Sequence, residues 1–294
     1  MNRHESGDAC HMSPDKSSQA KPTQPIEKMS RSTHPDSYKP SFSFSGDRPV
    51  AMVTGAGHRV GRAIALELAS RGCDLVLTYR TSRDATSQTA TLAAAEQISA
   101  HAIELDLDDP GRVRALAVHL ARTLPRLDIL IHNASTYEPS PLASLDADRA
   151  AWQYRVNAIS PLVLSSCLAS RLGESPRAGG GAIVAMLDIH AQQLPRPDYA
   201  AYEMSKAALA AMVRSLSRDL APACRVNSVS LGVAAWPTTG SESDPRLQQR
   251  YLKRVPLARS GTPAQAAKAV AFLALDATYT TGHILCVDGG RSLM

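Results

Sequence analysis

Short aliphatic runs alternate with longer segments of helical period from residue 49 to the end of the chain. This alternation predicts an α/β domain with a single doubly wound, Rossmann-type parallel sheet of seven strands. The expected strands lie at residues 49–54, 73–79, 101–105, 127–133, 181–187, 225–230 and 282–287. A helix is expected at 60–68, where apolar residues recur every four positions, and two more at 152–172 and 200–220, which are long enough for helices. A further helix is expected to begin at Thr262-Pro263, a pair typical of a helix start.

The first 46 residues differ from the rest of the chain. They are rich in Ser, Pro and charged residues, and Ile26, Phe42 and Phe44 are their only large aliphatic or Phe side chains. Such a segment buries too little apolar surface to offset the entropy lost on ordering. We therefore expect a disordered N-terminal arm at residues 1–46 and one folded domain at residues 47–294.

Composition narrows the classes of function. The 294 residues are 44% hydrophobic and carry a formal net charge of +5, but the positive residues are scattered and only 4% of the chain is aromatic, so we expect no nucleic-acid partner. The longest apolar runs have seven residues, too few to span a membrane. The five cysteines form no CxxC pair, so we expect no metal site and a cytoplasmic location.

A glycine-rich segment, Thr54–Gly61, joins the first expected strand to the first expected helix. Glycines let the backbone turn sharply and approach a pyrophosphate, whose charge is then met by the free amides of the helix. Gly55, Arg59, Val60 and Gly61 are the candidate cofactor contacts. The alternative is a glycine-rich turn that binds no ligand.

The end of the second expected strand indicates which cofactor binds. NAD sites place an acid there for the ribose 2′-hydroxyl, whereas this chain has Tyr79, Arg80, Thr81 and Ser82. An arginine beside two hydroxyls suits a 2′-phosphate, and Arg59 adds a second cation, so NADPH is favoured over NADH. The alternative is that Arg80 is a solvated surface cation.

Tyr202 and Lys206 lie four positions apart near the start of an expected helix, so both side chains project from one face. A phenol is a poor proton donor or base at neutral pH, but a neighbouring ammonium favours its ionised form and lowers its pKa. The Tyr-x-x-x-Lys pattern also arises by chance in many helices. Its value here comes from its place beyond the phosphate loop.

Together these motifs resemble the short-chain dehydrogenase/reductase family, over essentially residues 48–294. The resemblance implies a relay of Tyr202, Lys206 and Asn157, and support of the adenosine side of the cofactor by Asn133. It further implies a homotetramer built on the helices at 152–172 and 200–220. The remaining cofactor contacts that it implies are Asp106, Leu107, Ala134, Ser135 and Gly232, and Val287–Gly290 matches the family's closing motif.

Two departures from that family resemble its pteridine reductases. Arg59 stands where most members have a third glycine, and Asp188 stands at the end of the fifth strand where most have a catalytic serine. A carboxylate accepts hydrogen bonds from the amino-pyrimidine edge of a pterin or, when protonated, donates one. Tyr137, the aromatic after Asn133-Ala134-Ser135, is expected to stack on the pterin. Arg59, Ser135, Tyr137, Asp188 and Tyr202 are the candidate substrate contacts.

Purely structural roles are the alternatives for the candidate substrate contacts. Asp188 caps a turn in one interpretation, and Tyr137 is an ordinary core or surface residue in another. Asp188 precedes Tyr202 by fourteen positions, one more than the resemblance implies, and the extra residue is assigned to the turn at 195–198. Ser230-Leu231-Gly232 lacks the family's proline-glycine pair. Residues 233–250 are either a substrate lid or an unassigned loop.

The predicted function is NADPH-dependent reduction of a pterin or dihydropterin, with Tyr202 as proton donor and Asp188, Lys206 and Asn157 as further catalytic residues. Dihydrobiopterin, dihydromonapterin and dihydrofolate are the expected substrate types. One alternative function is that of a carbonyl reductase acting on a 3-oxoacyl thioester or ketone, and the presence of Asp188 argues against it. The other is a non-catalytic NADPH-binding regulator, against which the joint presence of Tyr202, Lys206 and Asn157 speaks.

Overall fold

The computed structural model describes residues 42–44, 46–237 and 241–294. The expected arm at 1–46 lies outside the described residues except for 42–44 and 46. Phe42 and Phe44 stack at 5.8 Å between ring centroids, and both meet the ring of His101 edge-on. These two residues therefore pack on the edge strand of the sheet.

A seven-stranded parallel sheet forms the centre of the domain, in the order β3-β2-β1-β4-β5-β6-β7. Each of the seven expected strands is present, and the expected Rossmann-type fold is confirmed. The strands are β1 (Val50–Val53), β2 (Asp74–Tyr79), β3 (Ala100–Glu104), β4 (Ile129–His132), β5 (Gly181–Asp188), β6 (Cys224–Leu231) and β7 (Ile284–Val287). The α-helices are α1 (Arg59–Ser70), α2 (Arg83–Ala94), α3 (Pro110–Thr123), α4 (Ala147–Tyr154), α5 (Ser160–Gly173), α6 (Ala200–Asp219), α7 (Pro245–Leu252) and α8 (Pro263–Ala271).

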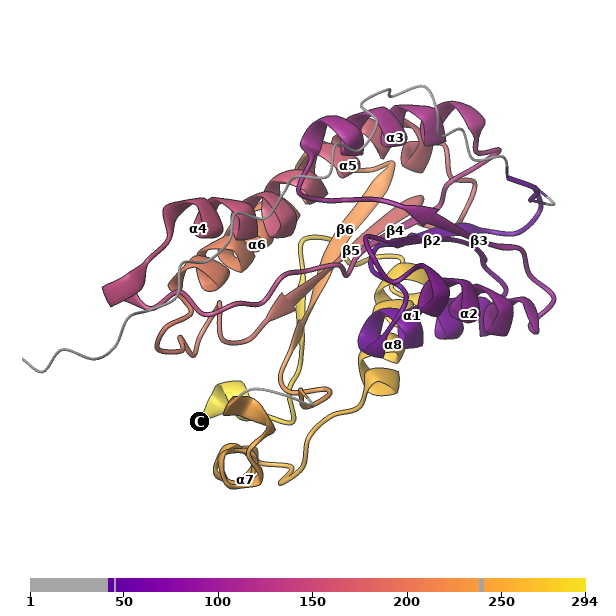
Figure 1. Cartoon of the computed structure of the whole chain (residues 1–294). Helices are drawn as coiled ribbons and strands as arrows, with labels where there is room; N and C mark the ends of the chain where they lie inside the picture. Colours follow the sequence, from indigo (N-terminus) through magenta and orange to yellow (C-terminus); the bar gives the residue numbers. More distant parts are fainter. Residues whose placement is uncertain (1–41, 45, 238–240) are drawn as a thin grey trace, which may run out of the picture. The chain divides into compact units, whose positions relative to one another are not determined.

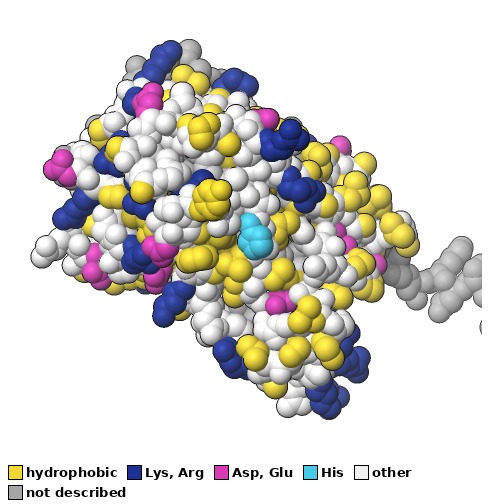
Figure 2. All heavy atoms as spheres, turned by 180° about the vertical axis from the view of Figure 1, so that it is seen from behind, with side chains coloured by type: hydrophobic (Ala, Val, Ile, Leu, Met, Phe, Trp, Pro, Cys, Tyr) yellow, Lys and Arg dark blue, Asp and Glu magenta, His cyan; other side chains and the backbone are white. Residues whose placement is uncertain are grey.

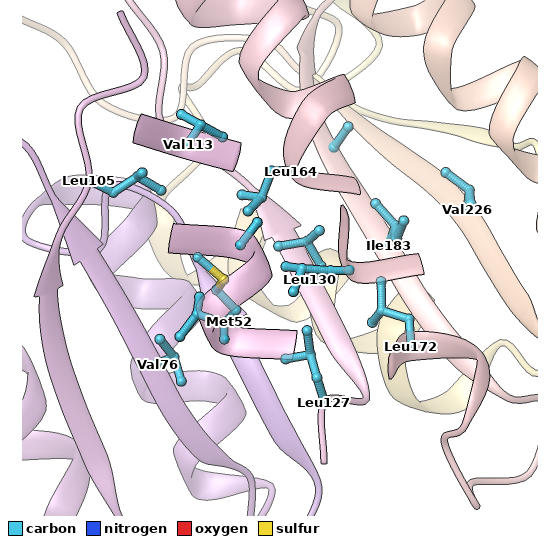
Figure 3. Packing of buried hydrophobic residues seen from close by; sticks show 14 of the residues in the cluster. Met52, Val76, Leu105, Val113, Leu127, Leu130, Leu164, Leu172, Ile183 and Val226 are labelled. Carbon is cyan, nitrogen blue, oxygen red and sulfur yellow. The ribbon is translucent and has the colours of Figure 1, made fainter. Parts of the chain in front are cut away.

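Helices cover both faces of the sheet, with α1, α2 and α8 on one face and α3, α5 and α6 on the other (Figure 1). Strand residues on alternate positions point to opposite faces. Met52, Leu130 and Ile183 pack with Leu164 of α5 on one side (Figure 3), whereas Ala51 and Ile131 belong to the cluster beneath α1 and α8. The central strands are buried on both faces. Helices packed on both sides therefore hold these strands, and with them the loops at their carboxyl ends, in place.

The prediction of one continuous helix at 152–172 is wrong. The chain forms α4, then a π-helical turn at Arg155–Ile159, and then α5. A π-turn widens the helix by one residue and changes the direction of the side chains within it, and Asn157 lies at its centre. By contrast, the helix expected after Thr262 begins there as predicted, with a capping box between Thr262 and Gln265.

Charged side chains are scattered over the surface: on the face in Figure 2, Lys and Arg lie among hydrophobic and uncharged residues. None of the helices in the described part of the chain is long and apolar enough to cross a membrane.

His132 makes the stability of the fold depend on pH. It is 3% exposed at the end of β4, its Nε2 lies 2.7 Å from Ser165 Oγ, and burial lowers its pKa from 6.5 to about 3. The unfolded chain therefore binds a proton between pH 6.5 and 3 that the folded chain does not, so this contribution to stability is present above pH 6.5 and is lost on acidification. We expect His132 to account for about 3 kcal/mol of lost unfolding free energy by pH 4.

Denaturant unfolding at pH 7.5 and pH 4 checks this expectation. The variant His132→Gln removes the titrating ring, so it should lose less stability than the wild type between the two pH values. Equal losses in both proteins would contradict the assignment.

Candidate functional site

A cavity of about 1000 Å³ lies along the carboxyl ends of strands β2, β1, β4, β5 and β6. Ligands of doubly wound folds bind at this edge. Of the site residues predicted from the sequence, Asn157 is not part of the lining, whereas the others line this cavity: Gly55, Arg59, Val60, Gly61, Tyr79, Arg80, Thr81, Ser82, Asp106, Leu107, Asn133, Ala134, Ser135, Tyr137, Asp188, Tyr202, Lys206 and Gly232.

The glycine-rich loop has the features that a pyrophosphate site needs. Gly55 has φ +67°, and a methyl group on Gly61 would lie 2.1 Å from the Gly55 carbonyl oxygen, so the strand and helix approach as closely as only glycine allows. His58, the N-cap of α1, makes no side-chain cap hydrogen bond, and the first turn contains no acid. The amides of this turn are thus left for an anion, and the loop fits a dinucleotide.

Arg59 adopts a backbone conformation with φ +48°, which L-residues rarely take. Its side chain is exposed, and its Nη2 donates a 2.8 Å hydrogen bond to the carbonyl of Ala235 in the segment after β6. The arginine that replaces a glycine therefore joins the phosphate loop to the substrate side of the cavity.

The end of β2 lies beside the phosphate loop. A methyl group on Gly57 would lie 2.8 Å from Thr86 Oγ1 and 3.1 Å from Ser82 Oγ, so this glycine permits the start of α2 to pack against the loop. Arg80 is exposed and lines the cavity. This corner presents one guanidinium and two hydroxyls to a ligand, because Thr81 and Ser82 line it as well.

Asn133 and Thr54 tie the ends of β4 and β1 together. Asn133 Nδ2 donates to the carbonyls of Thr54 and Gly55 at 2.9 and 3.0 Å, and Thr54 Oγ1 accepts from the backbone amides of Asn133 and Ala134. On the neighbouring side, Asp106 accepts from the amide of Asp108 at 3.0 Å. Asn133 thus shapes the wall of the cofactor half of the cavity by holding backbone rather than by facing open space.

Asn157 holds the loop after β4 from behind the cavity. Its Oδ1 accepts from Thr136 N at 2.8 Å and from Ser135 Oγ at 3.0 Å, and its Nδ2 donates to Thr136 O at 3.0 Å and to Ser205 Oγ at 2.9 Å. The amide is fully buried. Because Ser205 lies next to Lys206 on α6, the π-turn connects this loop to the helix that carries the candidate relay.

Asp188 reaches the phenol of Tyr202 despite the extra residue between them. Tyr202 Oη donates to Asp188 Oδ2 at 3.1 Å, while Asp188 Oδ1 accepts from the amide of His190 at 2.8 Å. The carboxylate therefore does both things considered from the sequence: one oxygen caps the turn after β5 and the other faces the phenol. The turn at residues 195–198, the expected place of the extra residue, contains Asp198 with φ +65°.

The pKa of Tyr202 differs from the sequence expectation. Burial and then the neighbouring Asp188 carboxylate raise the pKa of the phenol well above 10, instead of the ammonium of Lys206 lowering it. The ammonium of Lys206 does not lower this pKa because it is not in contact with the phenol. Lys206 Nζ lies 6.0 Å from the Tyr202 ring centroid and donates to the Met186 carbonyl at 2.9 Å. Tyr202 consequently keeps its proton at neutral pH, the state that a proton donor requires.

Sequence reasoning placed Tyr137 at the substrate end of the cavity but missed the residues that it contacts there, Tyr199, Arg196 and Glu242. Tyr137 stacks on Tyr199 at 4.6 Å between centroids, and its hydroxyl donates to Glu242 Oε1 at 2.8 Å and accepts from Arg196 Nη1 at 2.5 Å. Arg196 and Glu242 also form an ion pair. No motif marks these residues, which come from separate loops; His190 and Trp236 line the same end. Of the candidate lid at 233–250, residues 238–240 lie outside the described residues.

In the described ranges 42–44, 46–237 and 241–294, no three His, Cys, Asp or Glu side chains gather as a metal site would require.

Comparison with known proteins identifies the family. The profile described as enoyl-(acyl carrier protein) reductase matches residues 55–292. Pteridine reductase 1 of Leishmania tarentolae is 33% identical, covering 86% of this chain and 99% of that protein. The 3-oxoacyl-[acyl-carrier-protein] reductase FabG of Staphylococcus aureus is 29% identical, covering 82% and 96%. The crystal structure of acetoin dehydrogenase YohF from Salmonella typhimurium superposes with a TM-score of 0.74 at 29% identity, covering 84% and 96%. The chain belongs to the short-chain dehydrogenase/reductase family of oxidoreductases, which use a nicotinamide cofactor.

The protonation state of Lys206 is expected to make cofactor binding depend on pH. The side chain is buried, and burial lowers its pKa from 10.5 to about 8, although the Asp188 carboxylate acts to raise it. The ammonium form, which would donate to the ribose hydroxyls of a bound cofactor, is present below pH 8 and is lost above it. We expect the Kd of the nicotinamide cofactor to rise above pH 8 by up to about tenfold per pH unit.

Calorimetric titration between pH 7 and pH 9.5 measures this dependence. Lys206→Met has no titrating amine, so its weaker binding should be flat over the same range. A slope in the variant equal to that of the wild type would show that another group is responsible.

Proposed function

We propose that this protein reduces a pterin or dihydropterin with NADPH. The observation that carries the proposal is the carboxylate of Asp188, which lies 3.1 Å from the phenol of Tyr202 inside the cavity. A ketone reductase needs a neutral hydroxyl donor at this place to polarise the carbonyl oxygen. A carboxylate instead accepts hydrogen bonds from ring N–H and amino groups, which a pterin presents along one edge.

The surroundings of the carboxylate favour a flat heterocycle. The ring of Tyr137 lies 4.8 Å from that of Tyr202 in an edge-on arrangement and stacks on Tyr199. Trp236 lines the same end of the cavity and packs edge-on against Tyr251. Aromatic walls contact planar ligands over large areas. In this arrangement one face of the Tyr137 ring is covered by Tyr199, and its hydroxyl is bonded to Arg196 and Glu242.

The proton in the proposed reaction comes from Tyr202. The reduced nicotinamide, when bound, supplies a hydride to the carbon of a C=N bond, and the nitrogen takes a proton. Tyr202 holds that proton at neutral pH because burial and Asp188 disfavour the phenolate. Lys206 orients the cofactor ribose, and Asn157 positions Ser205 and the loop at Thr136.

The proposal of NADPH as cofactor rests on the corner at Arg80. An exposed guanidinium follows β2 where an acid would bind a ribose 2′-hydroxyl, and Ser82 lies against the phosphate loop. The similarity to pteridine reductase 1 at 33% identity supports the choice of substrate, and the similarity to FabG at 29% favours a 3-oxoacyl reductase as the second candidate.

We also propose a cytoplasmic homotetramer built on α5 and α6. Leu162 of α5 and Met204 of α6 are 43% and 66% exposed, which supports helix faces covered by another copy. The cysteines of the described residues, Cys73, Cys167, Cys224 and Cys286, are free, as a reducing compartment favours.

A substrate panel with variants of Asp188 tests the substrate class. Purified protein should oxidise NADPH with dihydrobiopterin, dihydromonapterin or dihydrofolate. Asp188→Ser removes a charged hydrogen-bond acceptor and should lower kcat/KM on the pterin by about ten- to hundredfold, and Tyr202→Phe should abolish turnover while NADPH still binds. The matched control is Asp219→Ser, which changes an exposed acid at the far end of α6 and should leave kcat/KM unchanged.

Turnover of a 3-oxoacyl thioester or simple ketone, without turnover of any pterin, would replace the proposal by the second candidate. Binding of NADPH with no turnover on any compound of the panel would instead favour a non-catalytic regulator.

Cofactor preference is tested at Arg80. Arg80→Asp replaces the cation by an acid that suits a free 2′-hydroxyl, so the ratio of kcat/KM for NADPH over NADH should fall by roughly tenfold or more. Arg83→Ala, a neighbouring exposed arginine that does not line the cavity, should leave the ratio unchanged. An unchanged ratio in Arg80→Asp would mean that this arginine does not bind the cofactor.

A further inference from the structure

Three loops that are distant in sequence meet at one end of the cavity. Tyr137 follows β4, Arg196 follows β5 and Glu242 follows β6, and all three side chains line the cavity. The strands lie in the order β2-β1-β4-β5-β6, so the meeting point is at the opposite end from Arg80 of the cofactor corner. The catalytic phenol of Tyr202 lies between these two ends. Tyr137 of this group lies 4.8 Å from Tyr202 between ring centroids, so the group borders the place where a substrate would meet the phenol.

The three side chains close a triangle. Tyr137 Oη donates to Glu242 Oε1 at 2.8 Å, Arg196 Nη1 donates to Tyr137 Oη at 2.5 Å, and Arg196 forms an ion pair with Glu242. The side chains of Arg196 and Glu242 are 22% and 31% exposed, so the pair is partly shielded from water. Exposed ion pairs contribute little, and shielding strengthens them. The contacts thus form a connection across the cavity end rather than a solvated surface pair.

Each member of the triangle is anchored to the body of the domain. The backbone amide of Arg196 donates to Glu203 Oε1 of α6 at 2.6 Å, and the Tyr137 ring stacks on Tyr199. The backbone carbonyl of Glu242 accepts from Gln248 of α7 at 3.0 Å. These anchors hold the backbone from which the two charged side chains extend.

We propose that the Arg196–Glu242 pair is an end wall that limits the length of the substrate and so determines specificity within the substrate class. This inference rests on the proposed function and adds to it that short-chain pterins are preferred. A pterin with a short substituent fits between Tyr202 and the wall. A pterin with a long substituent, as in dihydrofolate, passes only if the ion pair separates, and the binding energy spent on that separation is lost from kcat/KM.

The wall also has a charge consequence. Separation of the pair leaves Glu242 facing the substituent, and the glutamate carboxylates of dihydrofolate repel it. Removal of Glu242 should therefore raise kcat/KM for dihydrofolate for two reasons. It opens the end of the cavity, and it frees Arg196 to bind a carboxylate of the substrate. Removal of Arg196 opens the end but keeps the repulsion, so its effect should be smaller.

The test compares two substrates that share the reacting ring, dihydrobiopterin and dihydrofolate. For the wild type, Glu242→Ala, Arg196→Ala and the charge exchange Arg196→Glu/Glu242→Arg, the measured quantity is the ratio of kcat/KM for dihydrofolate over dihydrobiopterin. We expect the ratio to rise roughly tenfold in Glu242→Ala, to rise less in Arg196→Ala, and to return toward the wild-type value in the exchange. Arg71→Ala breaks the ion pair with Asp276 outside the cavity and should leave the ratio unchanged.

Glu242→Gln guards against misfolding, because it keeps the size of the side chain while weakening the pair, and Tm is measured for every variant. An unchanged ratio in Glu242→Ala and Glu242→Gln, with pterin turnover retained, would overturn the end wall and leave the proposed function standing. If no pterin is turned over, the proposed function fails, and the same ratio is measured for long and short 3-oxoacyl thioesters. A length preference there that is insensitive to Glu242, or no turnover of either class, would overturn the end wall as well.

Discussion

The hydrogen bond between Tyr202 and Asp188 depends on a fixed spacing between α6 and the end of β5. Lys206 provides one tie, because its ammonium donates to the Met186 carbonyl of β5. A second tie lies at the start of α6, where the amide of Ala201 donates to Ser140 Oγ at 3.0 Å. Each tie joins a side chain to the backbone of another element: Lys206 holds α6 to β5, and Ser140 holds the start of α6 to the loop after β4.

The same burial acts on the two titrating groups of α6 in opposite directions. It raises the pKa of Tyr202 and lowers that of Lys206 to about 8, because in each case water is no longer present to solvate the charged form. A site that relied on a permanent phenolate would need a cation in contact with the phenol, and Asp188 occupies that place instead. The arrangement therefore suits delivery of a proton to a basic nitrogen better than abstraction of one from an alcohol.

The elements that the sequence predicts correctly are those set by local patterns. The seven strands, the helix at Ala200–Asp219 and the cap at Thr262 follow from runs, periods and a neighbouring Pro263. The π-turn at Asn157 does not, because its hydrogen bonds with Thr136 and Ser205 are 21 and 48 residues away in sequence. The contacts of Arg196 with Tyr137 and Glu242 span 59 and 46 residues and arise only when three strands are placed side by side. The same limit explains the wrong direction for the pKa of Tyr202, since burial and the exact partner of Lys206 are tertiary properties.

The loop after β4 connects the two halves of the cavity. Asn133 holds its first residue to the phosphate loop, and Asn157 binds both the amide and the carbonyl of Thr136. Tyr137 follows immediately, so its position is set from the buried side before Arg196 and Glu242 contact it. Arg196 and Glu242, which come from the loops after β5 and β6, both contact the Tyr137 hydroxyl. The π-turn at Asn157 thus binds both the loop that carries Tyr137 and, through Ser205, the helix that carries Tyr202 and Lys206.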